Sequence, residues 1–351
     1  PPPPARPRAA PPATVAAPVA RRLAGGLPAI VQRSTLTPTL ELRAVVAGRV
    51  GNAGRFEVAT DQPVTGASSL TLRCLPRELG DAIVELGAVV ASLEPSAAEE
   101  VDANRPRDVA RRLFARALGG RSTEAEGAAP GALLALVVGA VEPEPTFELL
   151  ARTLGTLAPG RLTGGEPGAL ADRPLIAARP AGAVQSQVGY LVAAPHPGSP
   201  EAHAWRLALY VLAHGYEGRL GKEAIARRGL VYWIDADYRS DGRRGWIELL
   251  AGIDPEKREA MRDLLLAEVR GLAERPPGAE EIAEARRHLV GRRATAAQSN
   301  GELAARHAAD WLLSGRLATA GELAAELEGV ADEAVRAAAR EFGKGVLVLV
   351  E

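Results

Sequence analysis

The sequence lacks most residues from which common metal and disulfide sites are built. It has one cysteine, Cys74, in 351 residues, which excludes an intrachain disulfide and any site that needs several cysteines. All five histidines follow residue 195, and no two have the one-turn spacing of a zinc-binding helix. The 42 basic and 43 acidic residues nearly cancel, so no excess positive charge indicates nucleic-acid binding. No apolar run approaches the roughly 20 residues of a membrane span, which leaves a soluble globular protein as the expectation.

Two stretches rich in proline or glycine divide the chain. The proline-dense start predicts a disordered, extended tail over residues 1–20. Residues 157–180 are dense in glycine and proline and predict a linker. We therefore expect a first domain over residues 21–156 and a second over residues 181–351. The chain begins without methionine or the apolar core of a signal peptide, so we expect a trimmed or mature form.

Both predicted domains combine strands with helices. In the first, the apolar pattern predicts strands at residues 39–47, 55–60, 69–74 and 131–141, and helices at 76–92, 107–118 and 146–154. In the second, it predicts strands at residues 187–194, 230–238, 245–252 and 345–350, a helix at 202–214, and several helices over 256–342. The fold class is therefore α+β, with two similar domains that each contain a mostly antiparallel sheet flanked by helices.

Several short motifs carry a resemblance to a known family. The segments QVGYLVAA (187–194), GRL (218–220) and RGLVY (228–232) follow in the order and spacing of the carboxy-terminal half of pitrilysin or insulinase-like (inverzincin) metallopeptidases. The first half resembles a reduced form of that family's amino-terminal domain, through residues 23–31, 39–48 and 130–141. The resemblance implies two domains arranged as half of a clamshell.

The family's catalytic motif is missing from this chain. Active members carry HxxEH on a helix, where two histidines bind zinc and the glutamate activates water. No HxxEH occurs here. The chain therefore resembles the degenerate, non-catalytic member of a pair, as in the mitochondrial processing peptidase and the core proteins of the respiratory cytochrome complex. The resemblance implies no cofactor in this chain, with zinc only in a homologous partner.

The resemblance also suggests substrate-binding residues. The family's carboxy-terminal domain contacts substrate through a tyrosine, which matches Tyr232, and through an arginine, whose position is taken by Ile225. Arg219 and Arg228 are the nearby candidates to replace it, together with Arg227. The alternatives are equally simple. Tyr232 could be a half-buried strand aromatic against Trp233 or Trp246, and Arg227 and Arg228 could form a solvated helix end.

Other candidate residues have plain structural interpretations. His203 and His214 flank the predicted helix 202–214 and are most simply helix-terminal residues. Cys74 follows a predicted strand in apolar company and is expected to be an inert, buried thiol.

The leading hypothesis is a non-catalytic subunit of a pitrilysin-like zinc peptidase pair, which forms a heterodimer with a zinc-bearing homologue, helps enclose a chamber and assists peptide binding. The alternative is a structural scaffold in a larger envelope or respiratory assembly without peptide contact. A third hypothesis is an autonomous peptidase with unconventional ligands. The compartment is not determined by the sequence, although the proline-rich start favours a periplasmic or envelope location slightly over the cytoplasm.

Overall fold

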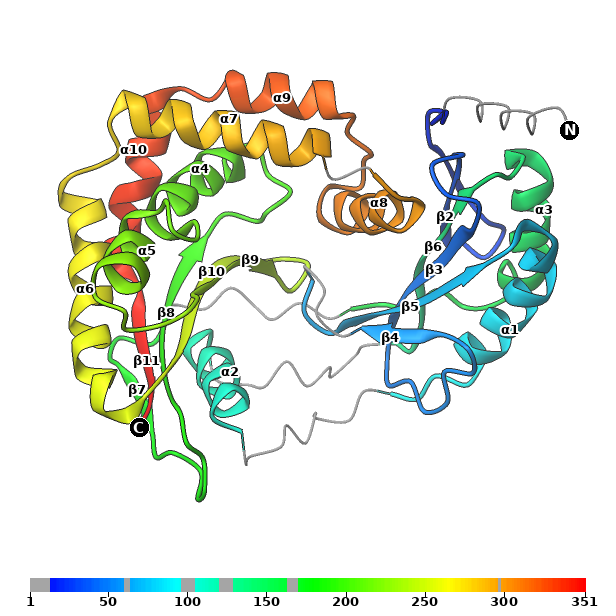
Figure 1. The fold of residues 1–351 in the computed structure, drawn as a ribbon. Helices are drawn as coiled ribbons and strands as arrows, with labels where there is room; N and C mark the ends of the chain where they lie inside the picture. The colour runs from blue at the N-terminus through cyan, green and yellow to red at the C-terminus, as the bar shows by residue number, and fades with distance from the viewer. Residues whose placement is uncertain (1–12, 60–63, 96–104, 120–128, 163–169, 296–297) are drawn as a thin grey trace, which may run out of the picture.

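A computed structural model describes residues 13–59, 64–95, 105–119, 129–162, 170–295 and 298–351. It contains two mixed sheets that stand side by side (Figure 1). The first has six strands in the order β1-β2-β6-β3-β5-β4. Their bounds are β1 Val19–Arg22, β2 Pro28–Arg33, β3 Leu40–Ala47, β4 Glu57–Ala59, β5 Ala67–Cys74 and β6 Gly131–Gly139.

The second sheet has five strands in the order β7-β11-β8-β10-β9. Their bounds are β7 Leu175–Ala177, β8 Ser186–Ala194, β9 Asp235–Ser240, β10 Gly245–Ile253 and β11 Val346–Val350. In both sheets most neighbours are antiparallel, and the parallel pairs are β2 with β6 and β7 with β11. Strands β6 and β11 are nearly continuous apolar runs because both of their faces are covered by other elements.

The helices described are α1 Leu79–Ala91, α2 Pro106–Ala117, α3 Pro143–Leu154, α4 Ala202–Ala213, α5 Arg219–Gly221, α6 Arg258–Glu274, α7 Ala279–Thr295, α8 Asn300–Ser314, α9 Ala320–Glu328 and α10 Asp332–Glu341. Helices α2 and α3 begin at a proline, which suits a first helical turn. A capping box at Ser299 and Glu302 fixes the start of α8, with the Ser299 side chain accepting a hydrogen bond from the Glu302 amide.

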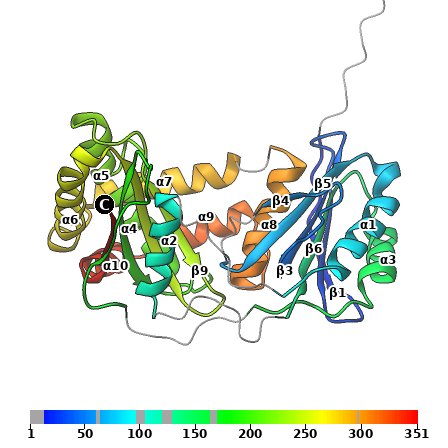
Figure 2. The ribbon, with the colours of Figure 1, turned by 90° about the horizontal axis from the view of Figure 1, so that it is seen from below.

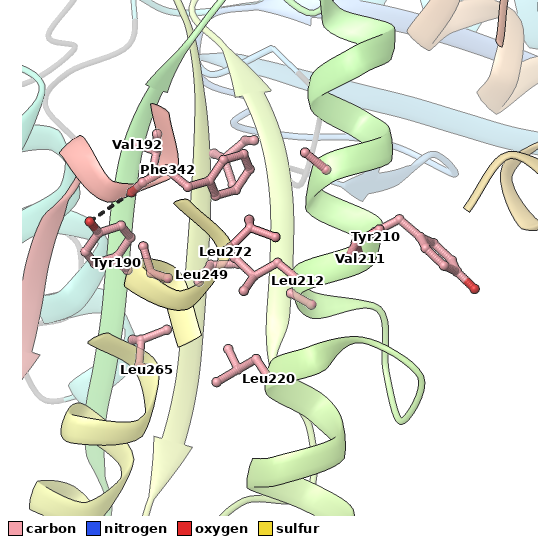
Figure 3. Packing of buried hydrophobic residues seen from close by; sticks show 14 of the residues in the cluster. Tyr190, Val192, Tyr210, Val211, Leu212, Leu220, Leu249, Leu265, Leu272 and Phe342 are labelled. Carbon is pink, nitrogen blue, oxygen red and sulfur yellow. Dashed lines mark hydrogen bonds between the residues drawn. The ribbon is translucent and has the colours of Figure 1, made fainter. Parts of the chain in front are cut away.

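Each sheet has one face covered by helices from its own half of the chain. In the first half, Leu42 of β3 packs with Leu86 of α1 and Leu150 of α3 in one buried cluster. In the second half, α4, α6 and α10 cover the sheet, and Figure 3 shows Leu249, Leu265 and Phe342 within that cluster. The hydroxyl of Tyr190 donates to the Phe342 carbonyl at 3.0 Å, so a polar group within the core has a partner.

The opposite face of each sheet is covered by a helix from the other half. Helix α2 comes between β5 and β6 in sequence, but it packs on β8, β11 and β7 of the second sheet. Helix α8 belongs to the second half in sequence, but it packs on β6 and β3 of the first sheet (Figure 2). Each half therefore contributes one helix to the core of the other half, and this exchange joins the two halves.

An apolar contact anchors α2 to the second sheet, and a buried hydrogen bond anchors α8 to the first. Phe114 of α2 is 1% exposed and packs against Gly189 of β8, where an added Cβ would come within 2.7 Å of the ring. In α8, the Nε2 of buried His307 lies 2.8 Å from Oε1 of Gln32 on β2. Gln32 in turn donates from its Nε2 to the Ala16 carbonyl at 2.7 Å, so the amide orientation makes neutral His307 the donor.

The two sheets also meet directly at one corner. Val64 and Ser240 form a parallel bridge, and Thr65 donates to the Ser240 carbonyl from its amide at 2.8 Å. Arg244 donates from Nη1 to the Leu118 carbonyl at 2.6 Å, which ties the end of α2 to the turn after β9. The concave arrangement of the two halves is thus held by backbone and side-chain contacts at its junction.

The structure confirms the α+β fold class and most predicted elements. Two details differ. The tail predicted over residues 1–20 is wrong from Thr14 onward, because the Thr14 amide bonds the Thr35 hydroxyl and β1 pairs with β2, while residues 1–12 lie outside the description. The strand predicted from residue 230 begins only at Asp235. The predicted domain division at residues 157–180 stays a prediction, since packing crosses it in both directions.

No helix in the described ranges is long and apolar enough to cross a membrane.

Replacement of Phe114 by alanine tests the docking of α2 on the second sheet. We expect Phe114→Ala to lower the free energy of unfolding by about 3–5 kcal/mol, because it leaves a cavity beside Gly189. The exposed Arg112 on the same helix provides the matched control, and Arg112→Ala should change that free energy by no more than about 0.5 kcal/mol. Urea unfolding measures both, and equal effects of the two variants would contradict the packing.

The burial of His307 predicts a loss of stability in acid. Burial, aided by the charges of Arg306 and Arg293, lowers the pKa of His307 from 6.5 to about 4. Between pH 6.5 and about pH 4, His307 is therefore protonated in the unfolded chain but neutral in the folded chain. We expect the free energy of unfolding to fall by up to about 3 kcal/mol across this range. His307→Asn should flatten the profile, and an unchanged slope in that variant would argue against His307 as its source.

Candidate functional site

The predicted substrate residues lie in the segment between α4 and β9. After α4 the chain turns through Gly218 into the single turn of α5 and then into a π-helical segment, Lys222–Arg227. Gly221 is needed here because an added Cβ would lie only 1.6 Å from the Gly215 carbonyl oxygen. Gly229 follows with φ +56°, in the left-handed region that favours glycine. Residues 228–234 then form an irregular segment in which Val231 is buried in the core of the second half, whereas Tyr232 and Trp233 are exposed.

Tyr232 stands out from this segment. Its side chain is 88% exposed, and the adjacent Trp233 is 61% exposed. Trp246 is 2% exposed and belongs to the cluster under α2, so Tyr232 is not a half-buried strand aromatic and that interpretation is wrong. The physical reason is that β9 begins three residues later, at Asp235, which leaves Tyr232 outside the sheet. Two exposed aromatic rings that serve no core are available to a ligand or partner.

Arg219 is held in a structural contact. Its Nε and Nη2 donate to the Glu281 carboxylate at 2.8 and 2.7 Å, and its Nη1 donates to the Arg275 carbonyl at 2.8 Å. The Arg219 hydrogen bonds lower the pKa of Glu281 below its ordinary value. Arg219 therefore joins the turn after α4 to the start of α7, and substrate contact would have to use the part of its side chain that remains exposed.

Arg227 and Arg228 share one carboxylate, that of Glu223. Arg228 Nε lies 3.6 Å from Glu223, and Arg227 Nη1 also pairs with it. Both arginines are more than half exposed, so the pairs contribute little to stability. Ile225, at the family's arginine position, is half-buried against the core of the second half. The apolar side chain at that position packs inward, and Arg228 is the candidate arginine nearest to Tyr232 in the sequence.

The histidines contact separate structural partners and do not converge on one point where a metal could bind. His203 Nε2 lies 3.1 Å from Glu326, and His307 contacts Gln32. The ring centres of His214, at the end of α4, and His288, on α7, lie 4.1 Å apart, and the His214 ring stacks on Tyr210 whereas the His288 ring is tilted to it. Across the part of the chain that the structure describes, no three metal-binding side chains gather at one point. The histidines of the described residues therefore do not fit the two-histidine zinc site of the pitrilysin-like metallopeptidases.

The predicted helix-terminal place of His203 and His214 is correct, since they lie at the start and the C-cap of α4. Cys74 is 5% exposed at the end of β5, and burial raises the pKa of its thiol. This agrees with an inert thiol, because a raised pKa keeps the sulfur protonated.

Two edge strands lie near the corner where the sheets meet. Strand β4 is the edge of the first sheet and β9 the edge of the second, and Ser240 at the end of β9 is bridged to Val64 across the junction. Strand β9 carries Asp235, Asp237 and Arg239, with Arg239 paired to Glu248 at 3.1 Å and Arg107 of α2 paired to Asp235 at 2.7 Å. An edge strand can bind an extended peptide through main-chain hydrogen bonds. Sequence periodicity did not identify these edges, because strand order is a property of the folded sheet.

Comparisons with known proteins agree with this geometry. Residues 129–289 match the family described as the peptidase M16 inactive domain. A sequence search of curated proteins found no match. Similar solved structures include a protease from Helicobacter pylori, with TM-score 0.74 and 13% identity over 96% of this chain and 100% of that one. A peptidase M16 inactive domain from Pseudomonas fluorescens has TM-score 0.72 and 16% identity, over 95% and 98% of the two chains.

A further similar chain comes from Complex III2 of Candida albicans with Inz-5 bound, with TM-score 0.71 and 12% identity over 95% of each chain. The predicted resemblance to the pitrilysin-like metallopeptidases is thus confirmed. Residues 129–289 thus resemble an inactive domain of this family, no HxxEH occurs in the sequence, and the solved structures share the fold over nearly the whole chain.

Alanine substitutions of Arg219 and Tyr232 should have different effects on the free energy of unfolding. Arg219→Ala removes three charge-assisted hydrogen bonds and should lower the free energy of unfolding by about 1–3 kcal/mol. Tyr232→Ala removes an exposed side chain and should change it by no more than about 0.5 kcal/mol. Urea unfolding of both variants checks this, and a large loss in Tyr232→Ala would show that the residue is structural.

Proposed function

We propose that this chain, whose residues 129–289 match the peptidase M16 inactive domain, is the non-catalytic subunit of a zinc peptidase pair. Its partner is a homologous subunit that carries the zinc motif. In this pair the present chain contributes shape, an exposed peptide-binding segment and one wall of a chamber. The proposal assigns it no proton transfer and no activation of water.

One observation carries the proposal. The chain has the complete two-sheet fold of peptidase-like proteins over nearly its whole length, but the HxxEH motif is absent. A fold kept without its catalytic residues is suited to binding and assembly, because these depend on surface shape and backbone edges. The exposed Tyr232 and Trp233 support a binding role, since exposed large aromatic side chains are enriched where proteins contact ligands or partners.

The chemistry expected of this chain is positioning. A peptide in extended form would add main-chain hydrogen bonds to an edge such as β9, and Tyr232 just before β9 would contact it through its ring and hydroxyl. Arg228 would offer a guanidinium to peptide carbonyl groups. The scissile bond would then be held near the partner's zinc site, with hydrolysis performed entirely by the partner.

A scaffold without peptide contact is the second candidate. It is favoured by the similarity to a chain of Complex III2 from Candida albicans, a large assembly. In that case the exposed aromatic residues would bind another protein subunit permanently, and a change at Tyr232 would affect assembly without affecting any peptidase.

Co-expression with a zinc-bearing homologue tests the leading proposal. We expect the two chains to co-purify and peptide hydrolysis to require both. In that pair Tyr232→Phe removes one hydroxyl hydrogen bond and should lower kcat/KM about fivefold, which corresponds to about 1 kcal/mol. Tyr216→Phe is the matched control, because Tyr216 is 63% exposed in the turn after α4, and it should leave kcat/KM unchanged.

The outcomes separate the two candidates. Failure of the chains to associate, or hydrolysis by the partner alone at the full rate, would refute the peptidase pair. Stable association with an unchanged kcat/KM in Tyr232→Phe would favour the scaffold.

A further inference from the structure

Arg306 of α8 has no ionic partner in the described chain. It is half-buried, and its Nε is fully buried without a hydrogen-bond partner. The two acidic residues one helical turn away, Glu302 and Asp310, share its side of the helix and would be its natural partners. Glu302 instead accepts the backbone amides of Gln298 and Ser299 in the capping box, and Asp310 accepts from Arg293.

Arg293 brings a second guanidinium to the same place. It comes from the end of α7, which lies beside α8 in Figures 1 and 2. Its Nη2 pairs with Asp310 and lies 3.4 Å from the Ala318 carbonyl, while its Nε is buried without a partner. Its side chain is 16% exposed. Asp310 therefore has Arg293 bonded to it and Arg306 one turn away, and a single carboxylate faces both cations.

A third arginine adds positive potential nearby. Arg206 of α4 donates to the Pro197 carbonyl at 2.6 Å and lies 5.5 Å from the centre of the Tyr238 ring, contacts that bring no negative charge. Burial first, and then the charge of Arg293, lower the pKa of Arg206. Burial and Arg293 likewise lower the pKa of Arg306. These directions indicate cations that are desolvated and that repel one another.

Other nearby acids do not restore neutrality. Glu326 pairs with Arg316 and contacts His203, and Asp241 pairs with Arg244. Burial lowers the pKa of His203, His196 and His307, so these rings stay neutral near pH 7. Three guanidinium groups thus meet one available carboxylate, Asp310. A half-buried cation without a counterion is costly, and a guanidinium presents its N–H groups in a fork that fits the oxygens of a carboxylate or phosphate.

We propose that Arg306 and Arg293 form a binding site for an oxyanion, the carboxylate or phosphate group of a ligand, at the junction of α7 and α8. Arg306 is the principal contact because its guanidinium has no other partner among the described residues. Arg293 contributes the N–H groups that Asp310 does not use, and Arg206 supplies positive potential. The site shares no residue with the segment around Tyr232 and does not depend on the peptidase-pair proposal.

Calorimetric titration of the full chain at constant ionic strength tests the site. One arm uses inorganic phosphate and the other a short glutamate-rich peptide with a blocked carboxyl terminus. We expect Arg306→Gln to weaken binding about tenfold or more, because it removes a charge-assisted hydrogen-bonding fork. Arg306→Lys keeps the charge without the fork and should bind with intermediate affinity. The control Arg287→Gln makes the same charge change at an exposed arginine of α7 and should leave the affinity within about twofold.

Thermal unfolding provides a second readout. The bound oxyanion should raise the Tm of the native chain and of Arg287→Gln, and it should not raise the Tm of Arg306→Gln. Arg306→Gln should fold, because the arginine it replaces makes no ion pair in the described chain. Binding of phosphate alone would assign the site to a small anion, and binding of the peptide would assign it to side-chain carboxylates. Failure of both probes to bind, or equal binding by Arg306→Gln, would overturn the proposal.

Discussion

The reciprocal exchange of α2 and α8 is the constraint on which the rest of the structure depends. Each sheet buries one face under its own helices and needs a second cover for the other face. Phe114 supplies that cover through α2, and Ala308 and His307 supply it through α8. Because each helix comes from the opposite half of the chain, neither half has a complete core alone. The orientation of the two halves is therefore set by core packing as well as by the single bridge at Ser240.

This exchange also positions the residues for which we propose binding roles. Helix α8 lies over the first sheet with its outer side toward the end of α7, where Arg293 and Arg306 come together. Helix α2 covers the second sheet up to β9, and its Arg107 pairs with Asp235 at the beginning of that strand. Tyr232 and Trp233 are exposed just before β9 begins. The two binding surfaces that we propose therefore both lie beside an exchanged helix.

The missing zinc motif and the retained fold are physically compatible. A sheet with its two layers of helices is stabilised by apolar burial, which does not require a metal ligand or a general base. The fold therefore does not need the HxxEH residues for its stability, because burial of the apolar clusters around Leu42 and Leu249 stabilises it. The surface carries the exposed rings of Tyr232 and Trp233, two sheet edges and an arginine pair, and the functions that we propose for them require contact alone. Such a chain can contribute to a reaction through positioning, while the reacting groups lie in another subunit.

The sequence by itself determined the local elements and the missing catalytic motif. Alternation and helical spacing located β3, β6, α1 and β8 within a few residues, because these patterns depend only on which side chains share a face. The sequence also excluded a histidine-pair helix outright. It could not place α2 or α8, since the apolar face of a helix does not specify which sheet will cover it. It could not show that Tyr232 is exposed, because the start of β9 depends on pairing with β10. It also could not show that Arg306 makes no ion pair in the described ranges, because this depends on the pairing of Asp310 with Arg293 of α7. Only the tertiary structure decided these points, because each depends on how separate helices and strands pack or pair with one another.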